Sequence, residues 1–466
     1  MKRIYIILTL LVCLFLNSIY AQRTSSCALC NMSINDNLHK ASVTIDDTTL
    51  SFDAIECLIN YLKVKNENNF SALKVADYLS GDLIDAKDAI FLKSKAIPSP
   101  MGANLSAFKT MDAASEFKNA KGGEIYTWDA IKSKFENSKF GATDHQHHDH
   151  FRPDAHAPIG IMGDHLHQKG GLMVSLRYMH MVMEGNKAGT NDIIDTDIYD
   201  SYMVAPQDMI MEMYMLGVMY APSDKLTLML MQSFARRDMN LTARMMMNGM
   251  TMFREFSTSS DGFGDFKLSA MYGIFNNHKT SLHLNGGISV PVGDIENRDD
   301  TPMVNNAKLP YAMQLGSGTF DITLGATYKE SYTNISWGTQ FLSTLRTGEN
   351  SEDYRFGNIY QLNIWGAYKI SKNLSLSARV NGINEGKLKG ADPDLNPMMV
   401  TTADTDNYGS NRIRTFLGLN IAFSENSGLK DFRFGIETGA PIYEDYNGVQ
   451  MNENLTLNLG VKYTVL

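Results

Sequence analysis

The sequence lacks several features that would assign it to a common class of protein. It has 4 cysteines in 466 residues, one of them Cys13 near the N-terminus, and this excludes a dense disulfide framework. A net charge of −9 and a pI of about 5.7 leave no basic surface for nucleic acid. No apolar run after the N-terminus is long enough to cross a bilayer as a helix. No Ser-His-Asp arrangement, phosphate-binding loop or carboxylate pair stands out, so we predict neither a hydrolase nor a phosphoryl-transfer enzyme.

Methionine and histidine are instead concentrated in two stretches. The chain has 29 methionines, and 19 of them lie between Met173 and Met271. Seven of the 11 histidines lie within residues 145–167. Thioether and imidazole groups both bind transition metals, so these stretches are candidates for metal chemistry.

The first 21 residues have the pattern of a secretory signal peptide. Lys2 and Arg3 precede an apolar run at residues 4–16, and residues 19–21 offer a cleavage site. An uncleaved anchor helix is the alternative. The residues before Cys27 form a poor signal for lipoprotein processing. We therefore expect an exported protein that carries no lipid at its mature start.

Residues 22–140 have mixed periodicity, which is typical of an α+β domain. We expect strands at 40–45 and 50–52 around an Asp46-Asp47 turn, followed by a helix at 54–65 with one apolar face. A second round repeats this order, with strands at 74–78, 84–85 and 89–92 and a helix near 107–119. Two similar α+β units are therefore predicted.

The motif Cys27-Ala28-Leu29-Cys30-Asn31-Met32 is the main chemical feature of this domain. Two thiols and a thioether suit a soft monovalent ion such as Cu(I). Disulfide exchange is a second hypothesis, although it usually needs a thiol at a helix N-terminus, and a structural disulfide is a third. Zinc would need two more ligands, and Cys57 alone does not complete the set. Cys57 lies on the apolar face of a predicted helix and is interpreted as a core residue.

Four segments in order resemble the NosL family of periplasmic copper-binding accessory proteins of nitrous-oxide reductase maturation. They are C-A-L-C-N-M (27–32), S-F-D-A-I-E-C-L-I-N-Y-L (51–62), S-P-M-G-A-N-L-S-A-F (99–108) and G-G-E-I-Y-T-W-D (122–129). The resemblance implies a fold of two related α+β halves. It also implies Cu(I) binding, with Met101 and a thiol of Cys27 or Cys30 as ligands, and the sequence itself adds Met32.

The resemblance to NosL has two departures. Asn31 stands where the family usually has glycine, and the family's lipid anchor at the first cysteine is not expected here. The partner can therefore be a periplasmic copper protein other than nitrous-oxide reductase.

Residues 141–170 are predicted to be a His-rich linker. Flexible histidine and aspartate side chains can gather metal, including Cu(II), without a fixed geometry. A solvated hydrophilic linker is the alternative. Residues 162–167 lead directly into the first predicted strand of the next region, so metal could be held there. The candidate ligands in the linker are His145, His147, His148, His150, His165 and His167.

Residues 171–466 alternate between apolar and polar side chains, which predicts an antiparallel transmembrane β-barrel. Short and long connections also alternate, as in outer-membrane barrels, so both termini should face the periplasm. A soluble β-sandwich or lipocalin-like barrel is the alternative. Residues 160–275 additionally resemble outer-membrane transporters of the phenol-degradation (MetA-pathway) type. The twelve expected strands are 172–183, 208–220, 226–234, 266–275, 281–290, 320–328, 335–345, 359–370, 374–381, 412–423, 432–440 and 455–466.

Methionines occupy one face of the first three expected strands. Arg177, Ser175 and Thr227 share this face and should avoid hydrocarbon, so we assign it to the barrel interior. Thioethers that bind Cu(I) weakly at several sites would permit its passage. Hydrophobic filling of a narrow barrel is the alternative, and further methionines in an expected loop at 238–262 favour metal. The candidate interior ligands are Met209, Met211, Met213, Met215, Met229 and Met231.

Taken together, these patterns predict a periplasmic Cu(I)-binding domain fused to a methionine-lined barrel in the outer-membrane lipid. The protein would bind, deliver or transport copper there. Two alternatives stay open. One is a passive channel for small apolar solutes, and the other is thiol–disulfide exchange by Cys27 and Cys30.

Overall fold

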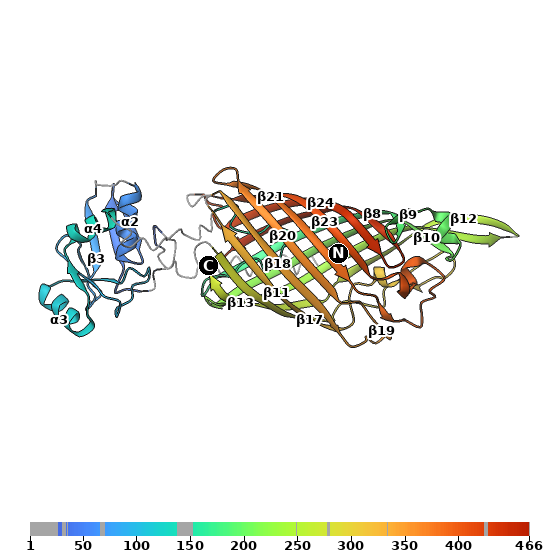
Figure 1. The fold of residues 1–466 in the computed structure, drawn as a ribbon, viewed down its shortest axis with the longest axis horizontal. Helices are drawn as coiled ribbons and strands as arrows, with labels where there is room; N and C mark the ends of the chain where they lie inside the picture. Colours follow the sequence, from blue (N-terminus) through green and yellow to red (C-terminus); the bar gives the residue numbers. More distant parts are fainter. Residues whose placement is uncertain are drawn as a thin grey trace. The chain divides into compact units, whose positions relative to one another are not determined.

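A computed structural model of the chain describes residues 27–29, 34, 36–65, 70–137, 152–247, 249–276, 280–332, 334–423 and 427–465. The chain forms two compact units, residues 1–147 and 148–466, which are described separately (Figure 1). Within the described residues, no helix is both long enough and apolar enough to span a bilayer.

The N-terminal unit consists of two halves with the same connectivity. In each half, the first strand lies in the middle of a sheet, between the second strand and the strand that follows the helix, in the orders β2-β1-β3-β4 and β6-β5-β7. The two related α+β halves are therefore confirmed. The first half contains β1 (Ala41–Ile45), β2 (Thr48–Phe52), α2 (Ile55–Lys65), β3 (Ala72–Ala76) and β4 (Leu83–Asp85). The second contains β5 (Ile90–Lys93), β6 (Leu105–Phe108), α3 (Met111–Lys121), β7 (Glu124–Tyr126) and α4 (Trp128–Asn137).

The helix predicted near residues 107–119 begins later than expected. All four residues of β6 are buried, and they pair with β5. The Thr110 side chain then caps α3 by accepting a hydrogen bond from the Ala113 N–H at 3.3 Å. A threonine cap of this kind satisfies a free N–H of the first helical turn, so the helix begins at Met111.

The C-terminal unit is a closed antiparallel barrel of twelve strands, as predicted. Each strand pairs with its neighbour in order, and β10 pairs with β8 to close the sheet. The wall strands are β8 (Leu172–Ala188), β10 (Val204–Ser223), β11 (Leu226–Met247), β13 (Phe266–Asn276), β14 (Thr280–Val290), β17 (Phe320–Ser331), β18 (Ile335–Thr347), β20 (Ile359–Lys369), β21 (Leu374–Glu385), β23 (Ser410–Ala422), β24 (Phe432–Tyr446) and β25 (Val449–Thr464).

Two connections differ from the expected loops. The predicted loop at 238–262 is a long β-hairpin, because β11 continues to Met247 and pairs with β12 (Met250–Phe263). The predicted loop at 441–454 is a tight turn between Tyr446 and Val449. In both segments the apolar and polar side chains continue to alternate, so the wall strands are longer than we predicted.

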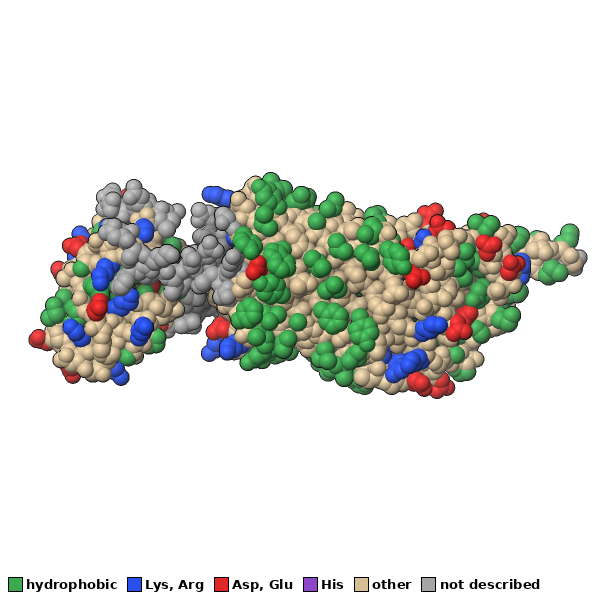
Figure 2. Space-filling view, in the orientation of Figure 1, with side chains coloured by type: hydrophobic (Ala, Val, Ile, Leu, Met, Phe, Trp, Pro, Cys, Tyr) green, Lys and Arg blue, Asp and Glu red, His purple; other side chains and the backbone are tan. Residues whose placement is uncertain are grey.

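Apolar side chains cover the outside of the barrel. Leu216, Leu228 and Leu230 are exposed, whereas Met173 and Met219 on the other face are nearly fully buried. Figure 2 shows hydrophobic side chains over the barrel wall and charged side chains mostly near its two ends. An exterior of this kind suits lipid, and the assignment of the methionine face to the interior is confirmed.

The long connections fold together at one end of the barrel. They contain β9 (Asn191–Ile193), α5 (Asp195–Tyr199), β15 (Arg298–Asp299), β16 (Ala307–Lys308), β19 (Tyr354–Arg355), β22 (Lys389–Gly390) and three short 3-10 turns at Tyr311–Met313, Thr401–Ala403 and Thr405–Asn407.

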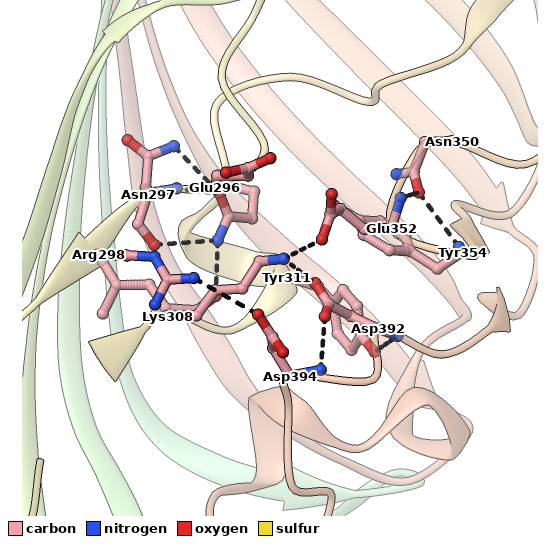
Figure 3. Close-up of polar contacts among 12 residues, drawn as sticks. Glu296, Asn297, Arg298, Lys308, Tyr311, Asn350, Glu352, Tyr354, Asp392 and Asp394 are labelled. Carbon is pink, nitrogen blue, oxygen red and sulfur yellow. Dashed lines mark hydrogen bonds and ion pairs between the residues drawn. The ribbon is translucent and has the colours of Figure 1, made fainter. Parts of the chain in front are cut away.

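Lys308 is the central charge of this end (Figure 3). Its ammonium group is 2.6 Å from the Asp392 carboxylate and also binds Glu352. Lys308 and Asp392 are almost fully buried, and the three residues come from three different long connections. A buried charge that loses its partner is strongly destabilising, so this cluster fixes the loops to one another.

We predict that Lys308→Met destabilises the folded loops by about 3–5 kcal/mol, because Asp392 is left buried without its cation. The measurement is urea unfolding in lipid vesicles, together with the rate of protease cleavage within residues 291–319. Arg298→Met is the matched control. It removes an ion pair of 3.5 Å to Asp394 in which both side chains are exposed, so it should cost about 0–1 kcal/mol. Equal behaviour of the two variants would refute the prediction.

Candidate metal-binding sites

Cys27, Asp53 and Cys57 form a buried cluster in the N-terminal unit. Their sulfur and carboxylate atoms lie within 4.8 Å of one another, and all three residues are at most 3% exposed. The local fold explains this arrangement. Asp53 directly follows β2, and Cys57 lies one turn further, in the first turn of α2. The Ala28 N–H donates to the Ser51 carbonyl at 2.8 Å, which holds Cys27 beside the end of β2.

Glu56 holds the loop that carries Met101. Its carboxylate accepts hydrogen bonds from the Ser99 hydroxyl and from the Ala103 N–H, the latter at 3.2 Å. Burial raises the pKa of Glu56 above its ordinary value, and these two donors oppose that rise. Met101 is half-buried and packs against the same core cluster that contains Cys27 and Cys57.

The two thiols and the neighbouring thioether are suited to a soft metal ion such as Cu(I). Of the predicted ligands, Cys27 and Met101 lie in or beside this cluster. Cys30 and Met32 lie outside the described residues. Sequence patterns alone provide no reason to name Asp53, and they favour a core role for Cys57. Asp53 and Cys57 are four residues apart, and this spacing places both side chains at the strand–helix junction. That spacing is the feature of the sequence from which the pair could have been predicted.

Residues 152–170, the second half of the predicted linker, form a plug inside the barrel. Inward side chains from separate strands bind its backbone carbonyls. His283 of β14 lies 2.9 Å from the Gly163 oxygen, Gln340 of β18 donates to Met162 at 2.8 Å, and Arg177 of β8 donates to Ile161 at 2.9 Å. Because these strands lie around the circumference, the segment between them occupies the interior.

The plug gathers three histidines and one aspartate. The ring centroids of His156 and His165 are 4.0 Å apart, and those of His165 and His167 are 4.7 Å apart. Asp164 accepts from His165 Nδ1 at 2.9 Å and from the Ala157 N–H at 2.8 Å. His145, His147, His148 and His150, the other predicted ligands of this region, lie outside the described residues.

The interior methionines lie in rows across β8, β10 and β11. Met183, Met209 and Met239 are direct neighbours in one row, and Met173, Met219 and Met229 are neighbours in another. Between these rows, Met211 and Met213 of β10 lie opposite Met181 and Met179 of β8. Met215 of β10 lies opposite Arg177 of β8. Met231 of β11 lies opposite Gly217 of β10.

Some of these methionines have a clear packing role. Met173, Met219 and Met271 form a cluster with Met229 and with Leu166 of the plug. Met209 and Met239 pack in a second cluster with residues of the long connections. Met211, Met213, Met215 and Met231 belong to neither cluster and are half-buried. Of the predicted ligands, these four have the least evident packing function, and Met179 shares their burial and lies outside both clusters.

The fold and the sites define a class of protein: an outer-membrane type of β-barrel preceded by an α+β domain with a buried cysteine cluster. Residues 19–135 match the NosL family model, and this confirms the resemblance of the N-terminal part. Comparison with curated proteins finds no significant match.

Two solved structures are similar to the two parts of the chain. An outer membrane channel from Pseudomonas putida F1 is 17% identical, with 65% of this chain and 99% of that chain covered and a TM-score of 0.45. The copper chaperone NosL from Shewanella denitrificans is 22% identical, with 23% of this chain and 92% of that chain covered and a TM-score of 0.22.

We predict that Glu56→Ala weakens Cu(I) binding by the full-length protein about 10–100-fold, because the loop with Met101 loses its anchor. Glu56→Gln keeps an acceptor for Ser99 and Ala103 and should bind nearly as the native protein does. The measurement is competition with a chromogenic Cu(I) chelator under anaerobic, reducing conditions. Equal affinities of the two variants would show that Glu56 does not position this loop for metal.

Proposed function

We propose that this protein handles copper at the outer membrane, with a Cu(I)-binding N-terminal domain and a barrel that exchanges copper with it. The observation that carries the proposal is the buried Cys27, Asp53 and Cys57 cluster, with Met101 at its edge, inside the region that matches NosL. Polarizable sulfur prefers soft ions, and burial protects Cu(I) from water and oxidants. Cu(I) is here the cargo of the protein.

The location of the two parts belongs to the same proposal. Residues 1–21 would direct export and be removed. The start of β8, the end of β25 and the connections that follow β10, β13, β17, β20 and β23 lie at one end of the barrel. The folded long connections and the tight turn between β24 and β25 lie at the other end. In outer-membrane barrels the short turns face the periplasm, so this arrangement favours a periplasmic N-terminal domain. A periplasmic copper protein would then be the donor or the recipient.

The burial of Cys27 favours copper over disulfide exchange. Its side chain is 0% exposed, whereas exchange requires a thiolate that can attack a disulfide of another protein. A buried thiol can still receive a small ion through a modest opening of the Met101 loop.

In the barrel, the half-buried methionines would offer Cu(I) a series of weak sites. Weak binding at several places lets an ion enter and also leave. His145, His147, His148 and His150 would collect Cu(I) or Cu(II) between the two parts of the chain.

A passive channel for small apolar solutes is the second candidate, and one observation favours it. A cavity of about 450 Å³ lies among the long connections and is lined largely by apolar side chains. Its lining includes Leu241, Phe256, Leu309 and Met399. Sites for apolar ligands have this composition and size.

The main test is a Cu(I) titration of the full-length protein in detergent micelles against a competing chelator, without oxygen. We expect the native chain to bind Cu(I) tightly at the sulfur cluster and Cys27→Ser, Cys57→Ser and Met101→Ala each to bind one Cu(I) fewer per chain. Met111→Ala is the matched control, because Met111 is an exposed methionine of the same domain, on α3. If the native chain does not compete with the chelator, the copper proposal fails.

A second test concerns the barrel. Replacing Met211, Met213, Met215 and Met231 by leucine preserves size and apolarity but removes the thioether, so we expect slower copper movement across vesicles that contain the protein. The control replaces the exposed Met246 and Met250 of the β11–β12 hairpin by leucine. Unchanged copper flux in the interior variant would assign these methionines to packing alone.

A further inference from the structure

We propose that the plug itself binds a late first-row transition-metal ion through His156, His165 and His167, with Asp164 as the orienting carboxylate. The site uses imidazole ligands and lies inside the barrel, so it differs in chemistry and place from the sulfur cluster. It goes beyond the proposed function, because it holds whether or not the N-terminal domain binds copper.

The distances are close to those that a metal ion requires. One ligand atom from each of His156, Asp164 and His165 lies within 4.8 Å of the others. Donors at about 2.0–2.1 Å from one ion in a tetrahedron lie about 3.3 Å apart. The His156, Asp164 and His165 side chains are therefore close to the spacing that one ion requires. The ring of His167 is next to that of His165, with the centroids 4.7 Å apart.

Three imidazole nitrogens of the plug have no hydrogen-bond partner among the described residues. They are His156 Nδ1, His165 Nε2 and His167 Nε2, and all three are buried. Buried polar atoms in proteins are almost always satisfied by a partner. One ion between these nitrogens would satisfy all three together.

The contact of Asp164 with His165 supports the choice of ligand atom. The carboxylate binds His165 Nδ1 at 2.9 Å, which leaves Nε2 free to face a metal. Carboxylate–histidine–metal arrangements of this kind fix the imidazole and raise its basicity.

Lys462 completes the surroundings of the site. Its ammonium group lies 3.5 Å from Asp164 Oδ1, and both side chains are buried. Lys462 therefore balances the charge of Asp164, and the imidazoles remain as the candidate ligands. This set suits copper and zinc, which bind imidazole well.

The ion would also fasten the plug. His156 lies near the start of the plug, and His165 and His167 lie close to its junction with β8. An ion held by all three would cross-link these two parts of the segment within the barrel interior.

The test uses the full chain in detergent micelles, with the sulfur cluster disabled by Cys27→Ser and Met101→Ala and with asparagine at His145, His147, His148 and His150. Zn(II) and Cu(I) are titrated separately against chelators, and metal content is measured after desalting. We expect one ion of at least one of these metals per chain. We also expect His156→Asn and His165→Asn to weaken that binding by at least about tenfold.

His180→Asn is the matched control, because His180 lies on β8 and faces outward, beside Glu212. It should leave metal binding unchanged. Heat-dependent electrophoretic mobility checks that every variant has a folded barrel. Should the plug variants fail to fold, the Cu(II)-loaded parent decides the matter, because an electron paramagnetic resonance spectrum with nitrogen couplings is expected. Absence of bound metal in the parent, unchanged affinity in His165→Asn, or a spectrum without nitrogen couplings would overturn the proposal.

The outcome is separate from that of the proposed function. The parent for this test carries neither Cys27 nor Met101, so a failure of the plug site leaves the sulfur cluster untested and intact. Conversely, loss of Cu(I) binding by the native N-terminal domain would not affect metal binding by the plug.

Discussion

Closure of the sheet between β8 and β10 is the constraint on which the rest of the barrel depends. A strand edge in hydrocarbon would leave backbone N–H and C=O groups without partners, and each would cost several kcal/mol. The pairing runs without a gap from Leu172 with Tyr220 to Glu184 with Asp208. Closure then separates the side chains into two sets, one that meets lipid and one that must be accommodated inside.

The interior set explains the position of the plug. Arg177, Gln340 and His283 are buried polar side chains that point inward, and each would lack a partner in an empty apolar lumen. The carbonyl groups of residues 159–163 satisfy them, while Leu166 meets the methionine cluster around Met219. Polar and apolar parts of the plug thus match the wall beside them. The plug and the barrel wall are consequently one folding unit.

The sequence predicted the barrel well and the plug poorly, for a physical reason. Alternation is a local signal, so all twelve wall strands and the inward direction of the methionines could be predicted from it. The plug carries no periodicity, and its partners are up to 298 residues away along the chain, as for Lys462 with Asp164. Similarly, Cys57 has the position of a core residue on α2, and only the folded N-terminal segment brings Cys27 to it.

The two candidate sites divide metal chemistry between them. The cluster of Cys27 and Cys57 offers sulfur in a closed core, which favours tight retention of a soft ion. The plug offers imidazoles, with one carboxylate already engaged by Lys462, and it lies inside the barrel. Retention and passage make opposite demands, since an ion that moves must also be released. In the proposed function, the thiols of the N-terminal domain would retain copper and the weaker thioether and imidazole ligands inside the barrel would release it, so one chain would meet both demands.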